Sequence, residues 1–309
     1  MSEWWIERGI GETRILLVEA GAIIEARAVL EGQVAAGTVL EAKLKSVGRN
    51  AVAVADDIEY LLPKGAPGVT QGAALTIEVT REAIGIEGWK RPLARSTNAP
   101  PAAAPALAGR HRNLPSPTDP LEAAGWSDLL EEARSGIVPF PGGKLRIAVT
   151  PAMTLIDVDG TLPPDELTIA GVRASAKAIR RHGIGGSIGI DLPTTGKAAR
   201  QAAVEAVDAI LPQPFERTAI NGFGFLQIVR PRRNASLFEL ALDSAAFEAR
   251  ALLRRASREV GSIELIASPA VINAIQPLWP EILAQQIGGA VSLRADPGLG
   301  IAGGHARRH

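Results

Sequence analysis

The sequence predicts two kinds of domain, an α/β (α+β) domain with a mixed sheet and a small all-β domain. Three observations carry this prediction. Residues 37–84 hold short β-prone runs separated by turn residues, residues 92–120 hold seven prolines, and from residue 121 helical stretches alternate with short apolar runs. A chain of 309 residues is long enough for two such domains, each with its own core.

The first 30 residues are predicted to form a β-hairpin that packs on the α/β domain. Two apolar, β-branched runs between Thr13 and Val29 are broken at Ala20-Gly21, which is the pattern of a hairpin. The next segment, 31–91, contains the runs VLEAKL, AVAVA and LTIEV with turn residues between them. About five short strands in such a segment are typical of a small barrel, and an OB-fold is the form that fits best.

The proline-rich segment 92–120 is predicted to be an extended linker, and the α/β domain follows at 121–309. Helices are expected at 121–135, 164–182, 195–211, 244–260 and 269–286, and strands at KLRIAV, MTLIDV, GSIGID, GFLQIV, IELIA and AVSLR. The hairpin-like run LRIAVTPAMTLIDV opens this domain. Because a hairpin joins antiparallel strands, the sheet is predicted to be mixed.

Composition narrows the function classes. The chain has no cysteine, which excludes disulfides and thiolate zinc sites, and none of its four histidines is spaced like a set of metal ligands. No apolar run approaches the roughly 18–20 residues of a membrane span. The first residues, MSEWWIERGIGE, do not resemble a secretory leader, so a cytoplasmic location is expected. Basic and acidic residues balance at 33 each, and the sequence assigns no oligomeric state.

Three aspartates stand where apolar strands end. Asp157 and Asp159 lie two residues apart in TLIDVDG, so they project from one face of the expected strand, and Asp191 ends GSIGID. Adjacent carboxylates repel one another and favour a divalent cation, and ligands of oxygen alone indicate Mg²⁺, with Mn²⁺ as the alternative, and no zinc. An aspartate at a strand end also commonly makes a turn or caps a helix, so a structural role stays open, least so for Asp157.

The run Leu155 to Leu162 also resembles the first motif of the haloacid dehalogenase superfamily of phosphatases. That resemblance implies Asp157 as nucleophile and Asp159 as general acid/base. The family also needs a later lysine and a later acidic pair. Lys197 is the last lysine of the chain, and no Asp-Asp or Gly-Asp-x-x-x-Asp follows it. The phosphatase is therefore kept as the alternative function.

A longer resemblance, in order and spacing, is to the ribonuclease E/G family. TLIDVD resembles that family's Asp-x-Asn metal strand, GGSIGIDLPTT its second metal strand, and NGFGFLQIVRPR its Arg-Phe-Gly segment. The resemblance implies a magnesium-dependent endoribonuclease that cleaves single-stranded RNA to 5′-phosphate and 3′-hydroxyl ends in RNA processing or decay. Asp157 and Asp191 would hold the metal, and Asp159 would stand at the family's asparagine.

The same resemblance implies RNA contacts at Arg230, Arg232, Phe223 and Lys90. The chain departs from the family in several respects. It has aspartate in place of the asparagine, it lacks the zinc-linking cysteines and the pocket that senses a 5′-phosphate, and Ala53 and Leu61 stand for the aromatics of the OB-fold. A non-catalytic RNA-binding relative is therefore a further alternative.

Overall fold

The computed structural model describes residues 2–85, 90–112 and 118–308. The described chain forms two compact units, each built from separate stretches of sequence. Unit 1 consists of 1–31, 108–134 and 240–309, and unit 2 consists of 32–107 and 135–239. The predicted domain at 121–309 is thus divided: its middle belongs to unit 2 and its last 70 residues, 240–309, belong to unit 1.

Unit 1 contains a four-stranded sheet in the order β3-β2-β1-β9. The predicted hairpin is confirmed as β2 (Glu12–Glu19) and β3 (Ala22–Leu30), and its turn has positive φ at Ala20 and Gly21. Two further strands join it, antiparallel β1 (Ser2–Arg8) and parallel β9 (Arg110–Arg112). The prediction placed residues 110–112 in a linker, because two arginines and a histidine give no apolar alternation.

The rest of unit 1 is mixed α/β. Strands β16 (Ile263–Ala267), β17 (Val291–Ala295) and β18 (His305–Arg308) form a sheet in the order β17-β16-β18, with β17 parallel and β18 antiparallel to β16. Helices α6 (Ser244–Ala256), α7 (Pro269–Ala274) and α8 (Trp279–Ile287) contribute to its core. The fully buried members of this core include Leu253, Leu265, Val271 and Leu283.

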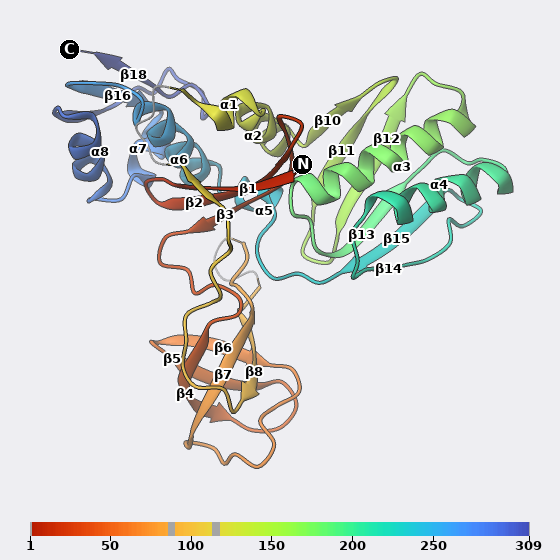
Figure 1. Ribbon diagram of the computed structural model, residues 1–309, viewed down its shortest axis with the longest axis horizontal. Helices are drawn as coiled ribbons and strands as arrows, with labels where there is room; N and C mark the ends of the chain where they lie inside the picture. Colours follow the sequence, from red (N-terminus) through yellow and green to blue (C-terminus); the bar gives the residue numbers. More distant parts are fainter. Residues whose placement is uncertain (1, 86–89, 113–117, 309) are drawn as a thin grey trace. The chain divides into compact units, whose positions relative to one another are not determined.

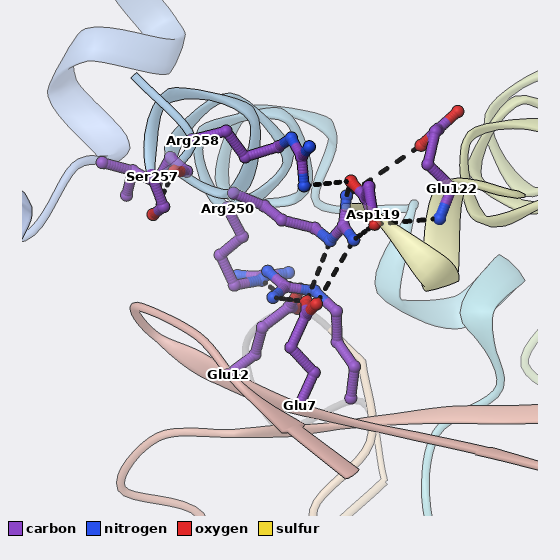
Figure 2. A network of polar contacts seen from close by, with 10 residues as sticks. Glu7, Glu12, Asp119, Glu122, Arg250, Ser257 and Arg258 are labelled. Atoms are coloured by element: carbon purple, nitrogen blue, oxygen red, sulfur yellow. Dashed lines mark hydrogen bonds and ion pairs between the residues drawn. The ribbon is translucent and has the colours of Figure 1, made fainter. Parts of the chain in front are cut away.

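A buried network of ion pairs connects three stretches of unit 1 (Figure 2). Arg254 of α6 pairs with Glu7 of β1 at 2.9 Å and with Asp119 at 2.8 Å. Asp119 also caps α1 (Pro120–Ala123), and Glu7 pairs with Arg14 at 2.9 Å. A charge buried in this way is tolerated only when it is paired, so the network fixes these stretches together.

Unit 2 contains a closed five-stranded barrel in the order β4-β5-β6-β8-β7. Its strands are β4 (Val39–Ser46), β5 (Ala51–Ala55), β6 (Ile58–Leu62), β7 (Ala74–Arg81) and β8 (Leu93–Thr97). Leu44, Tyr60, Leu62, Ile77 and Val79 fill the interior. The barrel was predicted, but its boundary at 91 was too early: β8, assigned to the linker, pairs with β6 and β7.

The second sheet of unit 2 has six strands in the order β10-β11-β12-β13-β15-β14. They are β10 (Ile137–Phe140), β11 (Gly143–Val149), β12 (Thr154–Gly160), β13 (Gly186–Asp191), β14 (Glu216–Arg217) and β15 (Phe225–Arg230). The predicted mixed sheet is confirmed, because β12 and β13 run parallel while β11 and β15 are antiparallel to them. Helices α3 (Pro164–Arg181) and α4 (Lys197–Ile210) lie on one face of it (Figure 1).

Glycine and proline account for the helices that were predicted too long. The expected helix at 121–135 is divided into α1 and α2 (Trp126–Ser135) at Gly125, whose φ is +94°. The expected helix at 269–286 is divided into α7 and α8, and Pro277 lies between them. No helix of the described residues is long and apolar enough to cross a lipid bilayer.

Candidate functional site

The alternation of β12 determines where its two aspartates point. Thr154, Ile156 and Val158 are buried, and α3 passes so close to Val158 that a Cβ at Gly171 would overlap it. The intervening residues Asp157 and Asp159 therefore project from the opposite face, which the helices leave uncovered. Asp157 is exposed and Asp159 is half-buried, as two carboxylates on an accessible surface must be.

Asp191 lies beside Asp157 on the same sheet. β13 runs parallel to β12, and the register pairs Asp157 with Asp191 as Cα partners. Adjacent strands lie about 4.8 Å apart, so the two carboxylates extend from neighbouring points of the backbone. Asp191 is the last residue of β13 and is exposed, whereas Ile188 and Ile190 face the helices. The structure thus brings together the three aspartates that the sequence singled out.

The electrostatics of this cluster are those of crowded carboxylates. Partial burial, followed by the negative charges of Asp159 and Asp191, raises the pKa of Asp157 above its ordinary value. Arg146 of β11 opposes this rise, and it forms an ion pair with Asp159 at 2.9 Å in which both side chains are about half exposed. Asp157 and Asp191 remain without an equivalent cation among the ion pairs of the described residues.

These oxygens fit a magnesium ion that keeps most of its water. In the described part of the chain, no group of three or more histidine and carboxylate side chains is arranged to hold a metal. Mg²⁺ is commonly held by only one or two carboxylates, with water and substrate phosphate completing its coordination. The donor set Asp157 and Asp191 meets that requirement, and the repulsion between them is what a cation relieves. Asp159 is engaged by Arg146.

Aromatic residues border the carboxylates at the start of β15. Phe225 is the Cα partner of Asp191, and its ring lies over Gly189, where a Cβ would be 2.5 Å from Phe225 Cζ. Phe223 precedes this strand and is 86% exposed. Asn221 fixes the loop, because its Oδ1 accepts the N–H groups of Phe223 at 2.9 Å and Phe225 at 3.0 Å. An exposed apolar ring therefore stands on the ordered loop that leads into the strand beside Asp191.

The basic residues after β15 do not lie beside the carboxylates. Since β15 is antiparallel to β13, Arg230 pairs with Gly186 at one end of β13 while Asp191 lies at the other end. Five residues of strand separate the two positions, which corresponds to about 17 Å. The sequence placed Arg230 and Arg232 after a strand next to the metal site. The strand is adjacent to β13, but its direction carries these arginines away from the three aspartates.

Arg232 instead lies near Lys90, a residue of the segment that follows β7. Lys90 Nζ donates to the carbonyl of Pro151 at 2.8 Å, and the charges of Arg232 and Arg81 both act on it. Two RNA contacts expected from separate segments thus lie in one cluster. Sequence reasoning missed Arg81, because its position at the end of β7 carries no signal besides charge.

The close approach of residues 231–232 explains the paired glycines 185–186. A Cβ at Gly185 would lie 2.8 Å from the carbonyl oxygen of Pro231, and one at Gly186 would lie 3.2 Å from Arg232 Cδ. Gly186 also has φ of +84°. The absence of side chains here lets Arg232 pack against the start of β13.

No family model matches this sequence, and no curated protein is significantly similar to it. The chemistry of the residues themselves therefore carries the functional argument.

Proposed function

We propose that this protein is a magnesium-dependent endoribonuclease that acts on single-stranded RNA, with an arrangement like that of the ribonuclease E/G family. The observation that supports this most directly is the register of β12 and β13, which pairs Asp157 with Asp191 on the uncovered face of the sheet. Two aligned carboxylates, and a third beside them, are an arrangement that costs stability unless a cation is bound.

In this proposal Asp157 and Asp191 hold the ion, Mg²⁺ or Mn²⁺. Such an ion supplies a bound water of lowered pKa and neutralises charge on the phosphodiester. The protein's own residues place the RNA. Phe223 offers a ring on which a base stacks, and its exposure on a fixed loop beside Asp191 supports that role. Arg146 forms an ion pair with Asp159, which stands where the family has asparagine. The ion pair offsets part of the negative charge that Asp159 adds to the site.

We further propose that the barrel is an OB-fold that guides RNA. Its first strand pairs with the second and the fourth, the third pairs with the fifth, and the fifth closes onto the fourth. An OB-fold binds oligonucleotides on the face of its second and third strands, here β5 and β6. Ala53, expected at an RNA-contacting position, is buried in the interior, while Val54 and Leu61 are partly exposed. A role in RNA processing or decay in the cytoplasm follows from this proposal.

The test is cleavage of a single-stranded RNA oligomer by the full-length protein. With Mg²⁺ we expect internal cleavage that leaves a 5′-phosphate and a 3′-hydroxyl, and with chelator we expect none. Metal ions contribute several kcal/mol of charge stabilisation in the transition state, so Asp157→Asn and Asp191→Asn should each lower the rate about a hundredfold or more. Asp128→Asn is the matched control, because Asp128 is an exposed residue of α2 in unit 1 and belongs to neither the barrel nor the six-stranded sheet.

Two outcomes contradict the proposal. Hydrolysis of a generic phosphomonoester without internal cleavage of RNA indicates the phosphatase chemistry that Asp157 would support as a nucleophile. Binding of RNA with no turnover of either substrate indicates a non-catalytic RNA-binding protein. Loss of RNA cleavage in the Asp128→Asn control as well as in the site variants would show that the change of charge, and not the site, is responsible.

A further inference from the structure

The uncovered face of the six-stranded sheet continues beyond the aspartates with a second row of residues. In the first row, Asp191 has Asp157 and Phe225 as its Cα partners on the two neighbouring strands. The residues two positions further along the same three strands, which are also Cα partners, are Leu155, Gly189 and Gln227. Residues two positions apart on a strand point to the same face and lie about 7 Å apart. The second row therefore shares the open face with the carboxylates and lies about 7 Å from them.

Two apolar side chains meet above the glycine of this second row. A Cβ at Gly189 would lie 2.5 Å from Phe225 Cζ and 3.1 Å from Leu155 Cδ2, so these side chains occupy the space of the missing one. They cover Gly189, which is buried although it faces the side that the helices leave uncovered. Leu155 is nevertheless 39% exposed, and Phe225 is partly exposed. A small apolar surface thus lies open to solvent beside the carboxylates.

A carboxamide borders this apolar surface. The backbone of Gln227 is fixed by Thr218, whose Oγ1 accepts its N–H at 3.2 Å and whose N–H donates to its carbonyl at 3.0 Å. Gln227 Nε2 donates to Ser187 Oγ at 3.4 Å. Among the described residues, Oε1 and the second Nε2 hydrogen of Gln227 have no partner. Gln227 therefore offers one acceptor and one donor next to Gly189.

We infer that Leu155, Phe225 and Gln227 form a subsite that recognises an adenine base of single-stranded RNA. The row from Leu155 to Gln227 contains no charged residue, which suits a neutral base and not a phosphate. Unpaired bases stack on aromatic rings and are read at their edges by hydrogen bonds. A glutamine carboxamide matches adenine in particular, because Oε1 accepts from the N6 amino group while Nε2 donates to N7.

This inference rests on the proposed function, because the aspartates locate the phosphate to which the base belongs. With the metal held by Asp157 and Asp191, the second row lies about 7 Å away along the strands. The subsite therefore takes the base of a nucleotide that adjoins the scissile phosphate. Its consequence is a preference of the enzyme for adenine next to the cleaved bond.

Recognition is tested by binding to the full-length protein in chelator, so that cleavage plays no part. The probes are fluorescently labelled oligomers of adenosine, of uridine and of cytidine, all of one length, and anisotropy at a fixed salt concentration gives their affinities. A bidentate contact discriminates between bases about 5- to 150-fold, so Gln227→Ala should reduce the preference for the adenosine oligomer by such a factor. Stacking within the free adenosine oligomer is the same for every variant and cancels when variants are compared.

Gln227→Glu should change the preferred base. A carboxylate has only acceptors, so it accepts from the N4 amino group of cytosine but repels N7 of adenine, and the preference should move from adenosine to cytidine. Gln285→Glu is the matched control, because Gln285 is an exposed residue of α8 in unit 1 and the change adds the same negative charge. It should leave the order of the three affinities unchanged.

Phe225→Leu tests the apolar surface separately. It keeps an apolar side chain above Gly189 but removes the ring, so all three oligomers should bind about 5- to 150-fold more weakly. Thermal melts check folding. Gln227 makes one side-chain hydrogen bond in the described structure, so Gln227→Ala should melt like the wild type, and it decides the question if Phe225→Leu unfolds.

The outcomes separate this inference from the proposed cleavage. The inference is overturned if folded Gln227→Ala and Gln227→Glu keep the affinity ratios of the wild type, or if the wild type prefers uridine or cytidine. Preference for adenosine that depends on Gln227, without cleavage in Mg²⁺, supports the subsite and refutes only the catalytic proposal. Cleavage in Mg²⁺ with no effect of Gln227 on base preference refutes only the subsite. A wild-type protein that binds none of the oligomers refutes both.

Discussion

Replacement of Arg254 by methionine tests the buried network of unit 1. Arg254 is 3% exposed and bridges Glu7, which is 2% exposed, and Asp119 (Figure 2). Methionine fills much of the same space but carries no charge. The two carboxylates then lose the partner that they share, and a buried charge without its partner is strongly unfavourable.

The expected loss follows from the pairs that remain. Removing one member of a buried ion pair costs about 3–5 kcal/mol, because the partner is left uncompensated. Here Glu7 keeps Arg14 at 2.9 Å, and Asp119 keeps Arg258 at 3.1 Å. We therefore expect the free energy of unfolding to fall by about 3 kcal/mol, at the lower end of that range.

Urea unfolding is the appropriate assay, because urea does not screen charges as guanidinium salts do. Arg95→Met is the control, since its exposed pair with Glu78 should be worth no more than about 1 kcal/mol. A loss in Arg254→Met no larger than in Arg95→Met would refute the reasoning.

Other predictions concern the carboxylates, the exposed ring and the helix packing. The raised pKa of Asp157 means that the folded state holds its proton more tightly, so metal-dependent cleavage should fail at a higher pH than the ordinary aspartate value of 3.8 predicts, and Asp159→Asn should move that acidic limb of the pH–rate profile to lower pH. An unchanged limb contradicts this assignment. Phe223→Ala should weaken RNA binding about 5- to 150-fold without lowering the melting temperature, since base stacking on an aromatic ring is worth about 1–3 kcal/mol. Gly171→Ala should destabilise the protein by about 1–3 kcal/mol in thermal unfolding, because its Cβ would overlap Val158, and equal stability would show that α3 shifts freely.

Local sequence patterns predicted the individual strands and helices better than they predicted how these elements are divided between the two units. The strands that carry Asp157 and Asp191 were found from their apolar runs, because the buried residues that face the helices give a strong local signal. The division of the last part of the chain between two units was not predicted. It depends on contacts such as that of Arg254 with Glu7, 247 residues apart, and periodicity holds no information on such pairs.

For the candidate site, the parallel pairing of β12 and β13 was within reach of sequence reasoning, and it brings Asp157 and Asp191 together. The direction of β15 could not be inferred from the sequence, and it places Arg230 at the opposite end of β13. Arg81 was missed for a related reason. A single arginine at the end of a strand gives no functional signal in the sequence. Only in the folded chain do the charges of Arg81 and Arg232 both act on Lys90.

The discontinuity of unit 1 has a consequence for synthesis of the chain. Glu7 is made 247 residues before its partner Arg254. At a translation rate of about 5–20 residues per second, roughly 12–50 s pass before the partner exists. All of unit 2 is completed within that interval, while β1 still lacks the helix that carries Arg254. We therefore expect unit 2 to fold first on the ribosome, and chains that terminate before α6 to be the preferred targets of chaperones and proteases.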